Sequence, residues 1–217
     1  MNFERLRQTV QNSHLEIFAA FHPGPDDLAP NTCKTLLLLG PHEPGFWAHV
    51  SSQPEFTDGA QNPLDRWSKR IAGKIASAIS AQAVFPSDGP PYPPFIAWAL
   101  QSGWVYASPV GLLVHHRAGL FVSFRAALAL SWAMDLPKPP PTPCETCRQQ
   151  PCRTACPIGA LSRSQYDVEA CRSYLSTPAG DRCKKQGCLA RRSCPASQSY
   201  GRLDAQSAFH MKAFHSS

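Results

Sequence analysis

The chain has 217 residues, of which 43% are hydrophobic and 17% charged, and its formal net charge is +6. This length suits one large domain or two small ones, and the apolar content suffices for a buried core, which excludes a wholly disordered chain. No run of about 18 apolar residues exists, which excludes a membrane span. The charged start, Met1 to Arg7, has no apolar segment behind it. We therefore expect no secretory signal and a cytoplasmic protein.

The positive charge lies in the C-terminal part. Residues 1–137 hold nine Lys and Arg against ten Asp and Glu, whereas residues 138–217 hold twelve against five. The C-terminal part therefore carries an excess of +7. Such an excess indicates either a surface for a polyanion such as nucleic acid or compensation for anionic groups bound by the same segment.

The N-terminal part mixes helical and extended patterns. Apolar residues across 2–20 recur near a helical period, and the apolar run 34–41 ends at Gly-Pro like a buried strand. Asn62 and Pro63 are a typical N-cap and first residue of a helix. Residues 94–101 predict another short helix, and 112–114 and 120–124 predict two strands joined by a turn. Together these elements predict an α+β fold built on one sheet.

Proline marks the expected domain boundaries. The stretch 137–143 contains five prolines, which favours a stiff, extended linker. We therefore expect an α/β domain over 1–136, a cysteine-rich domain over 144–200, and a tail over 201–217 that docks back on the body. Phe209, Met211 and Phe214 give that tail an apolar face.

Eight of the nine cysteines lie between Cys144 and Cys194. Three closely spaced cysteines, a fourth three residues later and a proline directly after it form the bacterial ferredoxin pattern, here with the second gap lengthened to four residues. In two-cluster proteins of that pattern, the cysteine before the proline ligates the other cluster. The pattern predicts two 4Fe–4S clusters, one on Cys144, Cys147, Cys152 and Cys194, the other on Cys156, Cys171, Cys183 and Cys188.

Two other uses of these thiols stay open. Two zinc sites of four cysteines each would require the same eight residues, and disulfides would require an oxidising compartment. The ninth cysteine, Cys33, precedes the apolar run 34–41, where we expect an inert buried thiol.

Cluster charge bears on the basic excess. An oxidised 4Fe–4S core with four thiolates carries about −2, so that two clusters bring about −4 to the segment that holds +7. Most of the excess is then compensation, and we do not expect nucleic acid as a partner.

Several segments resemble the cobalamin-dependent epoxyqueuosine reductases and, more distantly, the reductive dehalogenases. The resemblance covers about residues 62–200. It extends to short bacterial proteins labelled ferredoxin, which are similar in the Pro-rich loop 89–95 and in the ending 209–214. The segments that carry it are Gly103–His115, Gly119–Leu128, Cys156–Leu161 and Ala170–Thr177.

The resemblance implies a nitroreductase-like α/β domain joined to a two-cluster, ferredoxin-like module. It also implies a cobalamin or flavin site, for which Tyr106, Ser108 and His210 are the candidate residues, with His210 as a lower corrinoid ligand. Asp88 stands where the family places its catalytic acid, although Ser-Asp-Gly-Pro-Pro is also a turn sequence. Tyr106-Ala107-Ser108-Pro109 replaces the Gly-Lys-Asn segment of the family, so its lysine is missing.

The leading functional hypothesis is an iron–sulfur electron-transfer protein that serves a redox partner protein. The alternative is a reductase whose two clusters supply electrons to cobalamin or a flavin. The His115-His116 pair at the end of a predicted strand is interpreted as a solvated turn. The substrate, the electron donor and acceptor, and the oligomeric state do not follow from the residues.

Overall fold

The structure, a computed structural model, describes residues 1–216 and divides into two compact units. Unit 1 consists of residues 1–105 and 123–140, and unit 2 of residues 106–122 and 141–217. Helices and an antiparallel sheet are both present, which confirms the expected α+β class. Within residues 1–216, no helix is long and apolar enough to cross a membrane.

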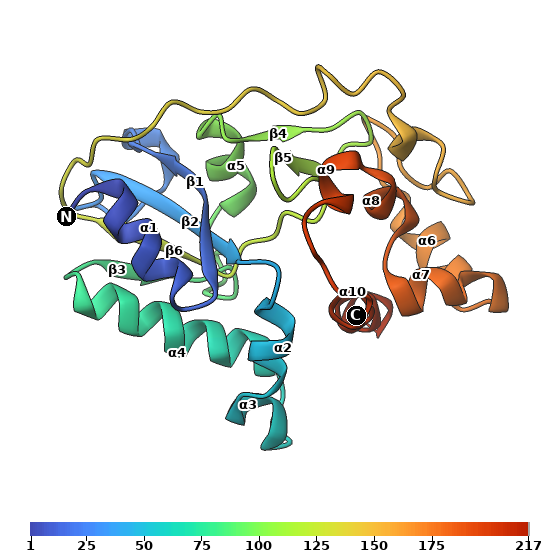
Figure 1. The fold of residues 1–217 in the computed structure, drawn as a ribbon, viewed down its shortest axis with the longest axis horizontal. Coiled ribbons are helices and arrows are strands. Elements are labelled where there is room, and N and C mark those ends of the chain that lie inside the picture. Colours follow the sequence, from blue (N-terminus) through green and yellow to red (C-terminus); the bar gives the residue numbers. More distant parts are fainter. Residues whose placement is uncertain (217) are drawn as a thin grey trace. The chain divides into compact units, whose positions relative to one another are not determined.

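The centre of unit 1 is a four-stranded antiparallel sheet in the order β1-β2-β6-β3 (Figure 1). Every residue of β1, β2 and β6 is buried, which is why these strands are mostly apolar rather than alternating; the exceptions are Glu16 in β1, which accepts a hydrogen bond from Arg7, and Thr35 in β2. The strands are β1 (Leu15–Phe21), β2 (Thr35–Pro41), β3 (Gln82–Val84) and β6 (Ala126–Leu130).

Helices cover this sheet. α1 (Phe3–Gln11) packs on β1, and the long helix α4 (Pro63–Ala78) packs on β3 and β6, as Figure 1 shows. α4 buries Trp67 and Ile75 on its apolar face. The remaining elements of unit 1 are η1 (Pro25–Asp27), α2 (Phe46–Ser51), α3 (Pro54–Thr57) and α5 (Phe95–Gln101).

The structure confirms the positions of three elements expected in the N-terminal part, although it differs in some details. The strand at 34–41 and the helices at 63 and 95 are present. The helical pattern of residues 2–20 continues only to Gln11, because His14 adopts a left-handed backbone (φ 58°) and the chain then enters β1. Asn62 is the N-cap residue of α4, as predicted, but its backbone is left-handed and its side chain makes no capping hydrogen bond.

Unit 2 contains short elements connected by many turns. β5 (Leu113–His115) pairs with β4 (Val105–Ala107), and this pair begins the unit. The rest is helical: η2 (Pro151–Arg153), α6 (Val168–Leu175), η3 (Pro178–Gly180), α7 (Asp181–Gln186), α8 (Leu189–Ser193), α9 (Pro195–Gln198) and α10 (Asp204–Ser216). α10, the expected tail, packs against α7.

Residues 120–124 are not the predicted strand. Gly119 has a positive φ of 55°, and the Leu120 amide donates a hydrogen bond to Ser197 Oγ at 2.8 Å instead of pairing with β5 beyond the His115–Gly119 bridge. Residues 106–122, which include Leu120, belong to the cysteine-rich unit, so the division of the chain differs from the expected boundary at residue 136.

Two glycines of unit 1 offer a matched test of this packing. A Cβ on Gly40 would lie 2.2 Å from Phe18 Cε2 and 2.4 Å from the Ser123 carbonyl oxygen, whereas a Cβ on Gly73 would meet nothing within 4 Å. Gly40→Ala should lower the free energy of unfolding by about 1–3 kcal/mol through overpacking. Gly73→Ala, inside α4, should raise it by up to about 1 kcal/mol. Thermal and urea unfolding check both, and an unchanged stability of Gly40→Ala would contradict the sheet packing.

Candidate metal centre

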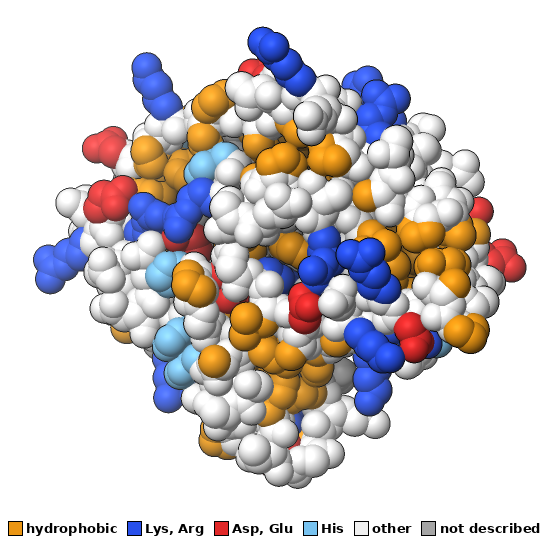
Figure 2. All heavy atoms as spheres, turned by 45° about the vertical axis from the view of Figure 1, so that its right-hand side comes forward, with side chains coloured by type: hydrophobic (Ala, Val, Ile, Leu, Met, Phe, Trp, Pro, Cys, Tyr) orange, Lys and Arg blue, Asp and Glu red, His pale blue; other side chains and the backbone are white. Residues whose placement is uncertain are grey.

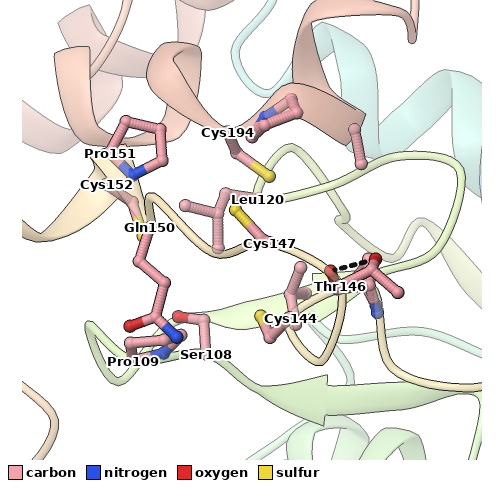
Figure 3. A pocket seen from close by; sticks show the side chains of 14 residues that line it. Ser108, Pro109, Leu120, Cys144, Thr146, Cys147, Gln150, Pro151, Cys152 and Cys194 are labelled. Atoms are coloured by element: carbon pink, nitrogen blue, oxygen red, sulfur yellow. Dashed lines mark hydrogen bonds between the residues drawn. The ribbon is translucent and has the colours of Figure 1, made fainter.

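Four cysteines of unit 2 surround one cavity. Cys144, Cys147, Cys152 and Cys194 line a space of about 300 Å³, and Figure 3 shows the sulfur atoms of Cys147 and Cys194 facing it from opposite sides. These four are the residues predicted for the first cluster, and we call them the first set. Two chain segments supply them: the loop around η2 carries three, and the junction of α8 and α9 carries Cys194.

The cavity wall is mostly apolar. Val114 and Leu120 from the start of unit 2 line it together with prolines, and both belong to the buried core that includes Cys152 and Cys194. Cys152 is 7% exposed and Cys194 is 9% exposed. Cys152 and Cys194 therefore lie in a low-dielectric environment with restricted access to water, whereas Cys144 and Cys147 are half-buried.

Burial raises the pKa of the Cys144 and Cys152 thiols. The neighbouring thiols of Cys194 and Cys147 raise both pKa values further, whereas a hydrogen bond with Thr142 lowers that of Cys144. The effect shows that the four sulfur atoms are near enough to disfavour one another's negative charge.

The other four cysteines form a separate group. Burial raises the pKa of Cys171 and Cys183, and the thiols of Cys188 and Cys156 raise both pKa values further. For each of the four cysteines with a shifted pKa in the two groups, the cysteines that act on it belong to its own group. We call Cys156, Cys171, Cys183 and Cys188 the second set; they are the residues predicted for the second cluster.

The helix α8 separates the two sets. Cys188 is its N-cap and Cys194 its C-cap, so the last cysteine of each set lies at one end of a helix of five residues. A helix of that length is about 8 Å long. α8 therefore holds the two sets side by side at a short, fixed spacing.

Arg191 lies in the middle of α8 and donates a hydrogen bond to the Leu120 carbonyl oxygen. Burial lowers the pKa of its guanidinium, and the Cys188 thiol is the largest influence in the opposite direction. Within residues 1–216, no carboxylate lies within ion-pair distance of Arg191. A guanidinium does not lose its proton in a protein, so this half-buried side chain stays cationic near Cys188, with no acidic partner among the described residues.

Within residues 1–216, no group of three or more His, Cys, Asp or Glu side chains is already gathered tightly enough to hold a metal ion. What the described residues provide is two sets of four free thiols, of which the first lines a cavity. The ninth cysteine, Cys33, donates a hydrogen bond to the Thr35 carbonyl oxygen at 3.2 Å, and burial raises its pKa. Both observations describe an inert thiol.

The candidate residues for a cobalamin or flavin site lie in different parts of unit 2. Ser108 is 3% exposed and lines the cavity of the first set, while Tyr106 in β4 packs against the same apolar core. His210 is half-buried in α10 with its ring edge-on to Phe209. A cobalamin or flavin site on these three residues stays a prediction.

Asp88 is held as a turn residue within unit 1. One of its carboxylate oxygens accepts a hydrogen bond from the Phe85 amide at 3.0 Å, and the other lies 3.0 Å from Lys69 Nζ. A catalytic role for Asp88 stays a prediction.

His115 differs from its expected solvated turn. Its side chain is 1% exposed, and its Nδ1 accepts hydrogen bonds from the amides of Arg117 and Ala118 at 3.2 Å each. The ring therefore stabilises the turn that leads to Leu120 and the cavity wall.

The basic side chains of unit 2 are partly neutralised within the unit. Lys184 and Lys185 both pair with Asp181, and Arg192 pairs with Asp204. On the face shown in Figure 2, Lys and Arg side chains are interspersed with Asp, Glu and apolar side chains rather than gathered into one continuous patch.

No family model and no curated protein matches this chain. Among solved structures, it is similar to a selenomethionine-labelled epoxyqueuosine reductase at 15% sequence identity and a TM-score of 0.46. The alignment covers 91% of this chain and 66% of the other, so the chain spans less than two thirds of the length of that reductase.

Two serines, one within α9 and one at its C-terminal end, test which hydrogen bond stabilises the cavity wall. Ser197 is 2% exposed and accepts the Leu120 amide hydrogen bond, whereas the exposed Ser199 bonds only to the Ala196 carbonyl oxygen at 3.2 Å. Ser197→Ala should leave the buried Leu120 amide unsatisfied and destabilise the protein by about 1–3 kcal/mol. Ser199→Ala should change stability by less than about 0.5 kcal/mol. Equal thermal midpoints of the two variants would contradict this role of Ser197.

Proposed function

We propose that this chain is an iron–sulfur protein that carries one 4Fe–4S cluster on each set of cysteines and transfers single electrons. The observation that carries the proposal is the grouping of the eight cysteines into two sets of four, one of which lines a cavity of about 300 Å³. Four thiolates are the ligand set of a 4Fe–4S cluster.

The size of the cavity supports a cluster over a single zinc ion. Zinc holds four thiolates at about 2.3 Å, which closes the site around the ion. A cavity of about 300 Å³ lined by four thiols has room for a core of eight atoms. The apolar wall of Val114 and Leu120 would also limit the access of water to such a core.

The charge of the second set supports the same assignment. Arg191 is half-buried, lies near enough to Cys188 for the two charges to interact, and has no carboxylate partner within residues 1–216, so that it lacks a nearby counter-ion. A cluster with four thiolates is anionic, at about −2 in its oxidised form. Bound to the second set, it would supply the negative charge that the described residues around Arg191 lack.

The spacing of the two sets supports electron transfer as the activity. α8 separates Cys188 from Cys194 by about 8 Å of helix, and Cys152 and Cys156 are four residues apart in the chain. Each bound cluster would supply one-electron redox chemistry, and the protein contributes their fixed separation and the apolar surroundings. This arrangement fits a ferredoxin-like module that passes electrons to a redox partner protein.

A reductase that uses cobalamin or a flavin remains the second hypothesis from the sequence. Its nitroreductase-like domain would be unit 1, and Asp88 its acid. The ligands for electron transfer are gathered in unit 2, whereas Asp88 is engaged by Phe85 and Lys69. Electron transfer is therefore the function that we propose.

Anaerobic reconstitution tests the proposal directly. The protein should bind about eight iron and eight sulfide ions per chain and give the EPR spectrum of reduced 4Fe–4S clusters on treatment with dithionite. A colourless protein with stoichiometric zinc would overturn the proposal.

Single cysteine variants test the two sets. Cys144→Ser and Cys194→Ser should each lower the iron content from about eight to about four per chain and remove the same EPR signal, because both residues belong to the first set. Cys156→Ser and Cys183→Ser should remove the other signal. Cys33→Ser is the matched control and should retain all of the iron. If Cys194→Ser and Cys183→Ser removed the same signal, the assignment of Cys194 to the first set would be wrong.

A further inference from the structure

We infer that Tyr166 and Arg191 raise the reduction potential of the second set above that of the first, so that an electron entering unit 2 comes to rest on the second set. This inference rests on the proposed function. It adds a direction of electron flow and two residues that no cysteine motif contains.

Tyr166 makes a direct contact with the second set. Its hydroxyl donates a hydrogen bond to Cys171 Sγ at 3.4 Å. Tyr166 lies just before α6, which carries Cys171, and a β-bridge to Leu161 fixes its backbone. The hydroxyl is therefore directed at the sulfur atom by local structure.

The C-terminal helix holds the Tyr166 ring in place. The ring stacks on Phe214 of α10 with a centroid distance of 6.0 Å and an interplanar angle of 11°. The guanidinium of Arg172 lies over the same Phe214 ring at 5.1 Å, and its Nε donates to the Phe214 carbonyl oxygen at 3.2 Å. The Phe214 ring thus contacts both the Tyr166 ring and the Arg172 guanidinium, and each of these two residues acts on Cys171.

Two cations face the second set. Arg172 lowers the pKa of Cys171, and the Arg191 guanidinium lies near enough to Cys188 for the two to affect each other's charge. Asp167, next to Tyr166, accepts a hydrogen bond from the Ala170 amide. It is not among the groups that act on the Cys171 or Cys183 thiol.

The first set has a different environment. Among the described residues, the charges that act on Cys144 and Cys152 are those of other cysteines of the first set, and the one side-chain hydrogen bond comes from Thr142. Arg148 and Arg153 follow Cys147 and Cys152 in the chain, but both are exposed to solvent. Water and salt screen exposed charges much more than buried ones.

The difference between the surroundings of the two sets affects their reduction potentials, because a cluster gains one negative charge when it accepts one electron. No bond in the protein forms or breaks in this step. Hydrogen bonds to the sulfur atoms and nearby buried cations stabilise the more negative state. The second set receives the Tyr166 hydrogen bond and two guanidinium groups, so its reduced form is the more stable of the two.

Tyr166→Phe removes the hydroxyl and keeps the ring. Its matched control is Tyr174→Phe, because the Tyr174 hydroxyl donates to the Ala179 carbonyl oxygen at 2.8 Å and not to a sulfur atom. In Tyr166→Phe, the equilibrium constant for reduction of one cluster should fall by about threefold to tenfold, which is about 30–60 mV for a one-electron couple. Tyr174→Phe should leave both potentials unchanged. The measurement is a potentiometric titration followed by EPR.

Single-cluster backgrounds assign the effect to a set. In Cys194→Ser, which should retain only the cluster of the second set, Tyr166→Phe should lower the potential. In Cys156→Ser, which should retain only that of the first set, it should have no effect. A shift confined to the Cys156→Ser background, or no shift in either background with the iron retained, would overturn the inference.

Arg191 variants supply an independent measurement if Tyr166→Phe loses iron. Arg191→Met should lower the potential of the second set, and Arg191→Lys, which keeps the charge, should restore most of it. Equal potentials in Arg191→Met and the wild type would overturn the part of the inference that rests on Arg191. Iron and sulfide are measured first in every variant. A wild-type protein without iron would contradict the proposed function, whereas full iron with unchanged potentials would contradict the further inference alone.

Discussion

The arrangement of unit 2 depends on a crossed use of its cysteines. Each set of four takes thiols from two chain segments, since the first set needs Cys194 from the end of α8 and the second needs Cys156 from the loop that otherwise serves the first. Neither site can be completed until the segment around η2 and the segment from α6 to α9 have come together. Local backbone geometry serves this requirement: α8 separates Cys188 and Cys194, and the prolines after Cys156 and Cys194 turn the chain without leaving an amide unpaired.

If the proposed clusters bind, folding of unit 2 and occupation of its two sites would therefore be coupled. Burial and the neighbouring thiols raise the pKa of Cys144, Cys152, Cys171 and Cys183, so without metal the protonated thiol is favoured at neutral pH. In the function that we propose, binding of iron would replace those protons, because the thiolate is the ligand. The same exchange would supply negative charge near Arg191, which has no carboxylate partner within residues 1–216.

Several elements of the fold and the grouping of the cysteines can be predicted from the sequence alone. The α4 helix follows Pro63 with a regular apolar stripe, and β2 is an apolar run bounded by Gly-Pro, so local pattern and structure agree. The grouping of the cysteines follows from the ferredoxin spacing, in which the cysteine before proline serves the other site. The pattern fails where long-range contacts decide. Residues 15–20 have a helical period but lie in a fully buried strand, and residues 120–124 have an extended pattern but form no strand, with the Leu120 amide bonded to Ser197 of α9.

For the same reason, the roles of the residues around the cysteines could not be predicted from the sequence. Tyr166 lies in the polar segment 162–167, where no pattern indicates that its hydroxyl bonds to Cys171 or that its ring stacks on Phe214, 48 positions along the chain. Arg191 is one of several basic residues between the cysteines. It is half-buried on α8 and has no carboxylate partner within residues 1–216, whereas Lys184 and Lys185 on α7 and Arg192 on α8 each have one. The net charge of unit 2 therefore has two components. Paired surface cations leave little field beyond a Debye length, whereas an unpaired, half-buried guanidinium acts on the adjacent sulfur atoms at close range. The second component is the one that differs between the two sets, and in the function that we propose it would give two sites with identical ligands different affinities for an electron.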